Sequence, residues 1–160
     1  MHRLTFFSMN ILIGNLQAKD IELRRKSVLA VANFGMKALL PIANIYNSTD
    51  NEMTKTSCLK TLVKIASKSH FDKCPNELTD IIEQAIQEES PQVILTVISL
   101  LRQMDRFGIP YLKKLCMDNN ILKARAAVTA ISECKDPSLS TFLSELVKDE
   151  SKDDLIKQAA

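Results

Sequence analysis

Apolar residues recur along this chain with the spacing of helices. One pattern puts an apolar or small residue at offsets 0, +4, +5 and +8, and it begins at Leu23, Met53, Val93, Leu122 and Leu155. A second pattern, at offsets 0, +3, +4 and +7, precedes each copy of the first and begins at Met9, Leu39, Leu78, Leu112 and Leu139. Residues three and four apart share one face of a helix, so both patterns predict amphipathic helices.

Polar residues, proline and glycine lie between these patterns and predict where helices begin and end. Pro91 and Pro137 follow Ser90 and Asp136, an arrangement typical of a first helical turn. Gly35 and Gly108 follow helix ends, where a left-handed residue is common. We therefore expect helices near 5–17, 20–34, 36–47, 51–67, 77–88, 91–105, 109–118, 120–134, 138–148 and 151–160.

These helices group into antiparallel pairs that repeat at intervals of about 30 to 40 residues. A single pair cannot bury its apolar face, so we expect the pairs to stack into one all-α solenoid domain covering residues 1–160. Residues 67–76 are longer than the equivalent connections and predict an insertion loop. The expected pairs are 5–34, 36–67, 77–105, 109–134 and 138–160.

The junctions between paired helices carry a family resemblance. The segment FGMKALLP at 34–41 resembles the helix junction of HEAT-like repeats, as do GIPYL at 108–112 and KDPSL at 135–139. The segment ILKARAAVTAI at 121–131 resembles the second helix of such a repeat. The short period is similar to that of the phycobilisome-lyase-type subclass, whose members include bilin lyases, phycobilisome-degradation factors and scaffolds. The resemblance implies a superhelix of helical hairpins and a phycobilisome-related role.

Candidate catalytic chemistry is sparse. The sequence has no nucleophile-elbow, phosphate-loop or zinc-protease motif. His70, Asp72 and Cys74 lie together in the insertion loop, and we interpret them as a polar loop rather than as a nucleophile or metal site. Cys134 lies near a helix end and, like Cys74, is a conceivable reactive thiol. We expect no catalytic residue, no metal and no cofactor, with a bilin as the alternative cofactor.

Composition and charge narrow the setting. The chain is 46% hydrophobic and 25% charged, values typical of globular proteins, and no apolar run reaches the length of a membrane span. Four cysteines without a C-x-x-C pair favour a reducing, cytoplasmic location. The net charge is +2, but residues 1–75 carry +6 and residues 76–160 carry −4. The basic half predicts attraction to an acidic partner surface.

The second helices of a HEAT-like solenoid line its concave surface, so aligned positions on those helices predict a binding row. The aligned positions and the basic stripe beside them are Arg25, Leu29, Lys55, Leu59, Lys60, Lys64, Leu95, Ser99, Ala124 and Val128.

We interpret the chain as a non-catalytic protein-binding scaffold or chaperone-like factor whose partner is a phycobiliprotein or another acidic protein surface. One alternative is a bilin lyase or isomerase that holds an open-chain tetrapyrrole. Another is nucleic-acid binding through the basic half, which the scarcity of aromatic residues disfavours. The C-terminal repeat, which ends at Ala160 without a polar capping turn, could also pair with another copy.

Overall fold

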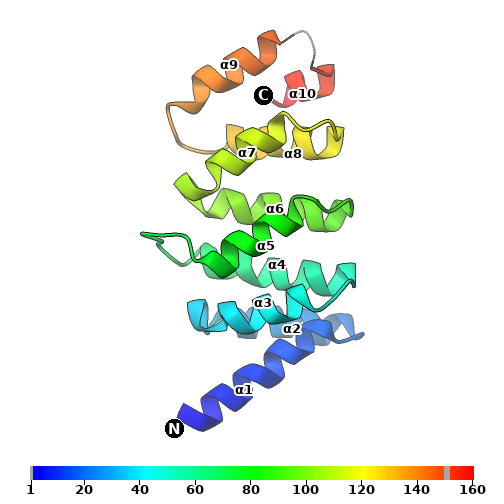
Figure 1. The fold of residues 1–160 in the computed structure, drawn as a ribbon, viewed down its shortest axis with the longest axis vertical. Coiled ribbons are helices and arrows are strands. Elements are labelled where there is room, and N and C mark those ends of the chain that lie inside the picture. The colour runs from blue at the N-terminus through cyan, green and yellow to red at the C-terminus, as the bar shows by residue number, and fades with distance from the viewer. Residues whose placement is uncertain (1, 150–151) are drawn as a thin grey trace. The chain divides into compact units, whose positions relative to one another are not determined.

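The computed structural model describes residues 2–149 and 152–160, and all the regular structure within those ranges is helical (Figure 1). The prediction of an all-α protein is therefore confirmed. The α-helices are α1 (His2–Gly14), α2 (Ile21–Ala32), α3 (Leu39–Asn47), α4 (Glu52–Ala66), α5 (Asn76–Ala85), α6 (Pro91–Gln103), α7 (Ile109–Cys116), α8 (Ile121–Ser132), α9 (Leu139–Lys148) and α10 (Asp154–Ala159). Short 3-10 helices are η1 (Asn15–Gln17), η2 (Gly35–Ala38) and η3 (Asp105–Phe107). Across the described residues, no helix is long and apolar enough to cross a membrane.

Side-chain caps explain why several of these helices begin where they do. The carboxylate of Asp20 accepts a hydrogen bond from the Leu23 amide at 2.7 Å. Asn51 caps α4 in the same way, and Asn120 caps α8. Each cap satisfies an amide that the first helical turn leaves without a partner. The predicted helix ranges agree with the observed ones to within about three residues. Residue 151, the first of the last predicted range, lies outside the described residues.

The two proline signals have different outcomes. Helix α6 begins at Pro91, as expected, although the Ser90 hydroxyl is bonded to Glu52 rather than to its own helix. The expectation for Pro137 is wrong, because α9 begins two residues later, at Leu139. Asp136 instead accepts hydrogen bonds from the backbone and hydroxyl of Ser138, and so forms a turn before the helix.

The two glycine signals also differ. Gly35 adopts the expected left-handed conformation, with φ +57°. Gly108 does not, because its φ is −81° and the left-handed residue of that junction is Asp105, with φ 47°. Gly108 is instead required by close packing, since a Cβ there would lie 1.8 Å from the carbonyl oxygen of Leu101. The expectation of a left-handed Gly108 is therefore wrong.

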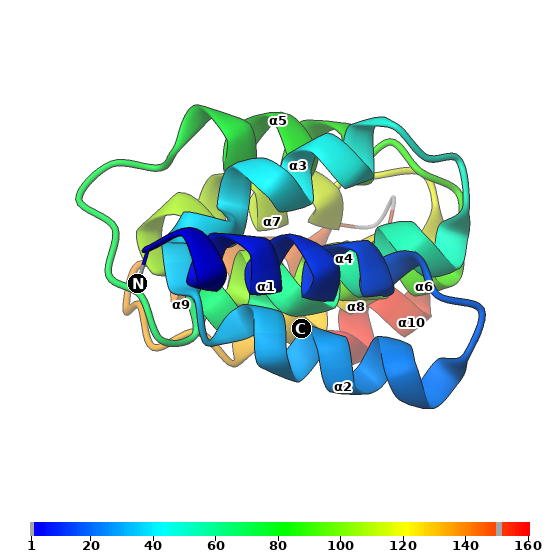
Figure 2. The ribbon, with the colours of Figure 1, turned by 90° about the horizontal axis from the view of Figure 1, so that it is seen from below.

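The chain divides into two compact units, Met1–Leu100 and Leu101–Ala160. In the first unit α2 packs against α4, while α3 packs against α4 and α5. Seen end-on in Figure 2, α3 and α5 form one layer, and α2 and α4 form the other. Side chains between these layers are buried, and each large one contributes about 1.5–3 kcal/mol. The largest fully buried side chains of this unit are Leu16, Ile42, Tyr46, Leu59, Leu78, Ile81, Ile82, Ile94 and Leu100.

In the second unit α8 is the central helix. It packs against α7, α9 and α10, and its inward residues Ala127, Val128 and Ile131 are fully buried. Leu112 and Cys116 of α7 meet this core. Nothing in this packing tests the expectation of one continuous domain, which stays a prediction. Residues 67–75 separate α4 from α5, within the range 67–76 that the sequence predicts to be an insertion loop.

Candidate binding groove

A cavity of about 540 Å³ opens in the first unit beside α2, α4 and α6. We call it the groove. Its volume lies within the range of small-molecule binding sites, about 300–1,000 Å³. Its lining residues are Arg25, Val28, Leu29, Lys60, Val63, Lys64, Thr96 and Ser99.

Apolar side chains form much of the groove wall. Val28 packs inward with 7% of its surface exposed, whereas Leu29, the next residue of α2, is 56% exposed. Val63 of α4 is half-buried opposite them. Burial of such surface by a ligand contributes about 25 cal/mol per Å² of apolar area. The groove can therefore bind an apolar molecule through its wall.

Cations surround this apolar wall. Arg25, Lys60 and Lys64 are all exposed. Arg25 lies 3.5 Å from Glu22, and both side chains are largely in solvent, so this ion pair contributes little. Within residues 2–149 and 152–160, Lys60 and Lys64 form no ion pair with a carboxylate. Their charge is available to attract an anionic ligand.

The hydroxyl groups of the groove are committed as donors to their own helix. Thr96 Oγ1 donates to the Gln92 carbonyl at 2.6 Å, and Ser99 Oγ donates to the Leu95 carbonyl at 2.9 Å. A hydroxyl oxygen that donates its proton keeps lone pairs as acceptors. Thr96 and Ser99 can thus accept hydrogen bonds from N–H or O–H groups of a ligand.

A second cavity of about 230 Å³ adjoins the groove, and we call it the side cavity. Arg25, Val28 and Lys60 line both cavities, so the two are neighbours along α2 and α4. The side cavity is further lined by Ile21, Arg24, Met53, Thr56, Ser57 and Gln92.

The structure brings together about half of the residues that the sequence predicted for a binding row. Arg25, Leu29, Lys60, Lys64 and Ser99 all line the groove. Their role in binding stays a prediction, since the structure shows only their place.

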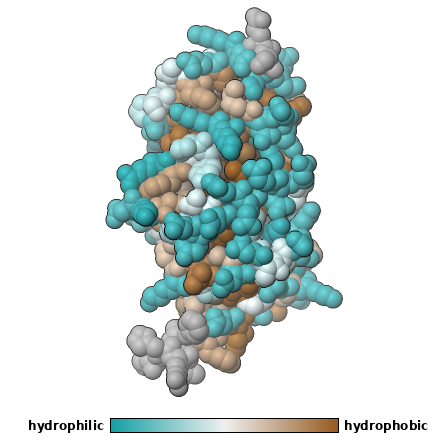
Figure 3. All heavy atoms as spheres, viewed as in Figure 1, coloured by the Kyte–Doolittle hydropathy of each residue, from teal (hydrophilic) through white to brown (hydrophobic). Residues whose placement is uncertain are grey.

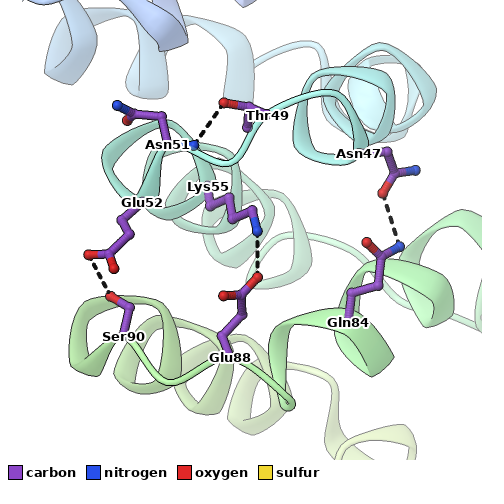
Figure 4. Close-up of polar contacts among 8 residues, drawn as sticks. All are labelled: Asn47, Thr49, Asn51, Glu52, Lys55, Gln84, Glu88 and Ser90. Carbon is purple, nitrogen blue, oxygen red and sulfur yellow. Dashed lines mark hydrogen bonds and ion pairs between the residues drawn. The ribbon is translucent and has the colours of Figure 1, made fainter.

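The remaining predicted residues lie elsewhere. Lys55 is 15% exposed and turns to Glu88, as Figure 4 shows, with its ammonium 5.8 Å from the centre of the Tyr46 ring. Leu59 is fully buried in the core, and Leu95 is exposed but does not line the groove. Lys55 and Leu59 are not among the residues that line the groove, whereas Lys60 and Lys64 are, so the predicted alignment of α4 with α2 is offset by five residues.

Ala124 and Val128 are both fully buried in the second unit and pack within its core.

Sequence reasoning missed Val28, Val63 and Thr96, which line the groove. The sequence does indicate Val63, because this residue lies between Lys60 and Lys64 on the exposed side of α4.

Polar contacts hold α3 to α5, and α4 to the start of α6, in the first unit (Figure 4). The Gln84 amide donates to Asn47 at 3.0 Å, and the Ser90 hydroxyl donates to Glu52 at 3.1 Å. These contacts fix the helices that carry the groove.

On the face drawn in Figure 3, hydrophilic residues predominate and hydrophobic ones appear in smaller areas between them.

Cys58, Cys116 and Cys134 are poor nucleophile candidates. Burial raises the pKa of Cys58 and of Cys116 to about 12. Burial also raises the pKa of Cys134, whose thiol donates to the Ala130 carbonyl at 3.4 Å. Cys74 accepts a hydrogen bond from Thr79 at 3.4 Å. Among the described residues, no cluster of three or more metal-binding side chains is present.

Comparison with known proteins gives one informative relative. No family model matches the chain. The chain is 25% identical over 153 residues to the bilin biosynthesis protein CpeZ of Synechococcus sp. (strain WH8020), with 92% of this chain and 82% of the relative covered. A relative in bilin biosynthesis contradicts our main prediction, a non-catalytic protein-binding scaffold, and agrees better with the bilin-related alternative.

Proposed function

We propose that this chain acts in bilin biosynthesis by holding an open-chain tetrapyrrole in the groove, as a bilin lyase or isomerase does. The similarity to a bilin biosynthesis protein supports this class of ligand. The observation that carries the proposal is the apolar groove surrounded by Arg25, Lys60 and Lys64.

The chemistry of the groove fits the chemistry of a bilin. An open-chain tetrapyrrole has a conjugated apolar body, two propionates and pyrrole N–H groups. Val28, Leu29 and Val63 offer apolar contacts to the body. The exposed cations attract the propionates, which are ionised at neutral pH. The oxygens of Thr96 and Ser99 supply acceptors for N–H groups.

The bilin supplies the reactive double bonds, and the protein binds and orients it. Apolar contacts along α2 and α4 restrict the ligand, which lowers the entropic cost of its reaction. In this proposal a phycobiliprotein receives the pigment and is the protein partner.

A titration with phycocyanobilin, followed by absorbance, tests the proposal. We expect a spectral shift that saturates, and a loss of affinity of about tenfold or more in the double variant Lys60→Glu/Lys64→Glu. Both side chains are exposed, so the melting temperature should change little. Lys37→Glu is the matched control, since Lys37 is exposed and lines neither cavity. Absence of a spectral shift with the unaltered protein would refute the proposal.

We also infer that the helical pairs continue as a HEAT-like superhelix. The packing within the first unit supports this inference, because α2 contacts α4 and α3 contacts α5. Each of these helices therefore packs against the equivalent helix of the next pair. Small-angle X-ray scattering provides the test. An elongated particle is expected, and a scattering profile of a compact bundle would contradict this architecture.

A further inference from the structure

Two exposed apolar side chains share the lining of the side cavity. Ile21 of α2 is 56% exposed and Met53 of α4 is 50% exposed, and both line this cavity. Each lies in the first turn of its helix, and Gln92, a third lining residue, lies in the first turn of α6. Figure 1 shows that α2, α4 and α6 begin on the same side of the first unit. Isolated exposed apolar residues are common, but two that share a cavity form a patch that a partner can cover.

The size of the side cavity indicates what kind of partner covers this patch. Its volume of about 230 Å³ is below the range of about 300–1,000 Å³ that is usual for small-molecule sites. A single aliphatic or aromatic side chain is small enough to enter it. Protein interfaces commonly contain such an anchor side chain in a pocket of the partner. The cavity is therefore better suited to a protein segment than to the body of a tetrapyrrole.

The charge around the side cavity indicates the composition of that segment. Arg24, Arg25 and Lys60 line the cavity, and none of the described residues that line it carries a carboxylate. The guanidinium of Arg24 is held in place, because it donates to the Ala18 carbonyl at 2.6 Å and lies 3.7 Å from the Met53 sulfur. Charge complementarity thus favours a segment with acidic residues beside its apolar anchor.

The side cavity also lies beside the groove, because the two share lining residues of α2 and α4. A protein that receives a pigment must bring its acceptor group close to that pigment. We propose that the side cavity docks an acidic, amphipathic segment of the phycobiliprotein that receives the bilin. An apolar side chain of this segment packs against Ile21 and Met53, and its carboxylates lie against Arg24 and Lys60. This assignment rests on the proposed function.

Binding of apo-phycocyanin, measured by biolayer interferometry, tests the docking site beside the titration with phycocyanobilin. Met53→Glu replaces an apolar contact by a charge of the same sign as that of the segment. We expect it to weaken binding of apo-phycocyanin by about tenfold or more. Met53→Leu keeps the apolar contact and should bind as the unaltered protein does. Neither change should alter the affinity for phycocyanobilin, because Met53 does not line the groove.

Leu40→Glu is the matched control. Leu40 is 56% exposed in the first turn of α3 and lines neither cavity, so this change should leave both affinities unaltered. Glutamate is favourable in the first turn of a helix, so Met53→Glu and Leu40→Glu should both keep the melting temperature of the unaltered protein.

The two measurements separate the docking site from the proposed function. Equal binding of apo-phycocyanin by Met53→Glu and by the unaltered protein overturns the docking site but leaves the proposed function standing. An equal loss in Met53→Glu and Leu40→Glu also overturns it, as does failure of the unaltered protein to bind apo-phycocyanin. Absence of a spectral shift with phycocyanobilin overturns the proposed function, whatever the result for apo-phycocyanin.

Discussion

Replacing Gly108 by alanine should strongly destabilise the second unit. A Cβ at this position would lie 1.8 Å from the oxygen, 2.6 Å from the carbon and 3.1 Å from the Cα of Leu101. A carbon and a carbonyl oxygen normally approach to about 3.3 Å, so the two backbone segments must separate by about 1.5 Å. The obstructing atoms are backbone atoms near the end of α6, and they cannot move aside as a flexible side chain can.

We expect Gly108→Ala to cost about 3 kcal/mol, at the upper end of the effects of overpacking. For a unit of this size, that corresponds to a fall of about 10 °C or more in melting temperature. The assay is thermal and urea unfolding followed by circular dichroism at 222 nm. The same measurements also give the size of the change in the free energy of unfolding.

Gly14→Ala is the control for this prediction. Gly14 has helical dihedral angles, and an added Cβ would meet none of the described atoms within 4 Å. Alanine is a better helix former than glycine, so this change should stabilise the protein by about 0.5–1 kcal/mol. If Gly108→Ala unfolds at the same temperature as the unaltered protein, the steric argument is refuted.

Two further predictions concern backbone strain and buried thiols. Asp105→Gly should stabilise the protein by about 1 kcal/mol in urea unfolding, because the left-handed φ of 47° is strained for aspartate and not for glycine. Unchanged or lower stability would mean that the aspartate side chain compensates for the strain. Cys58 and Cys116 should remain unmodified by a thiol reagent at pH 8 in the folded protein and react on unfolding, since burial raises the pKa of each to about 12. Because their pKa is higher in the folded state, stability should fall as pH rises from about 9 towards 12, and a flat unfolding midpoint over that range would contradict this.

The sequence predicts the helices well because their signals are local. Asp20, Asn51 and Asn120 each precede an apolar periodic run, and each caps a helix in the structure. The 3-10 segments at the junctions were not predicted, because they depend on how two successive helices meet. Pro137 shows the same limit, since a turn formed by Asp136 and Ser138 takes the place of a helical start.

The groove was predicted only in part because it depends on which way α4 faces. Lys60 and Lys64 form a basic stripe that is visible in the sequence, and both line the groove. Lys55 looks equally basic, but it lies five residues before Lys60 and so on another side of α4, where it pairs with Glu88. The side cavity has no signature in the sequence, because its lining residues come together only through the packing of three helices.

The backbone conformation at Asp105 changes how the repeats should be aligned with one another. Matching residue types pairs Gly35 with Gly108, an offset of 73 positions. Matching left-handed residues pairs Gly35 with Asp105 instead, an offset of 70, and this also matches Leu39 with Ile109, the first residues of α3 and α7. A consensus repeat averaged on the glycines would therefore combine residues from different positions of the hairpin. One averaged on the left-handed residues would keep equivalent positions together.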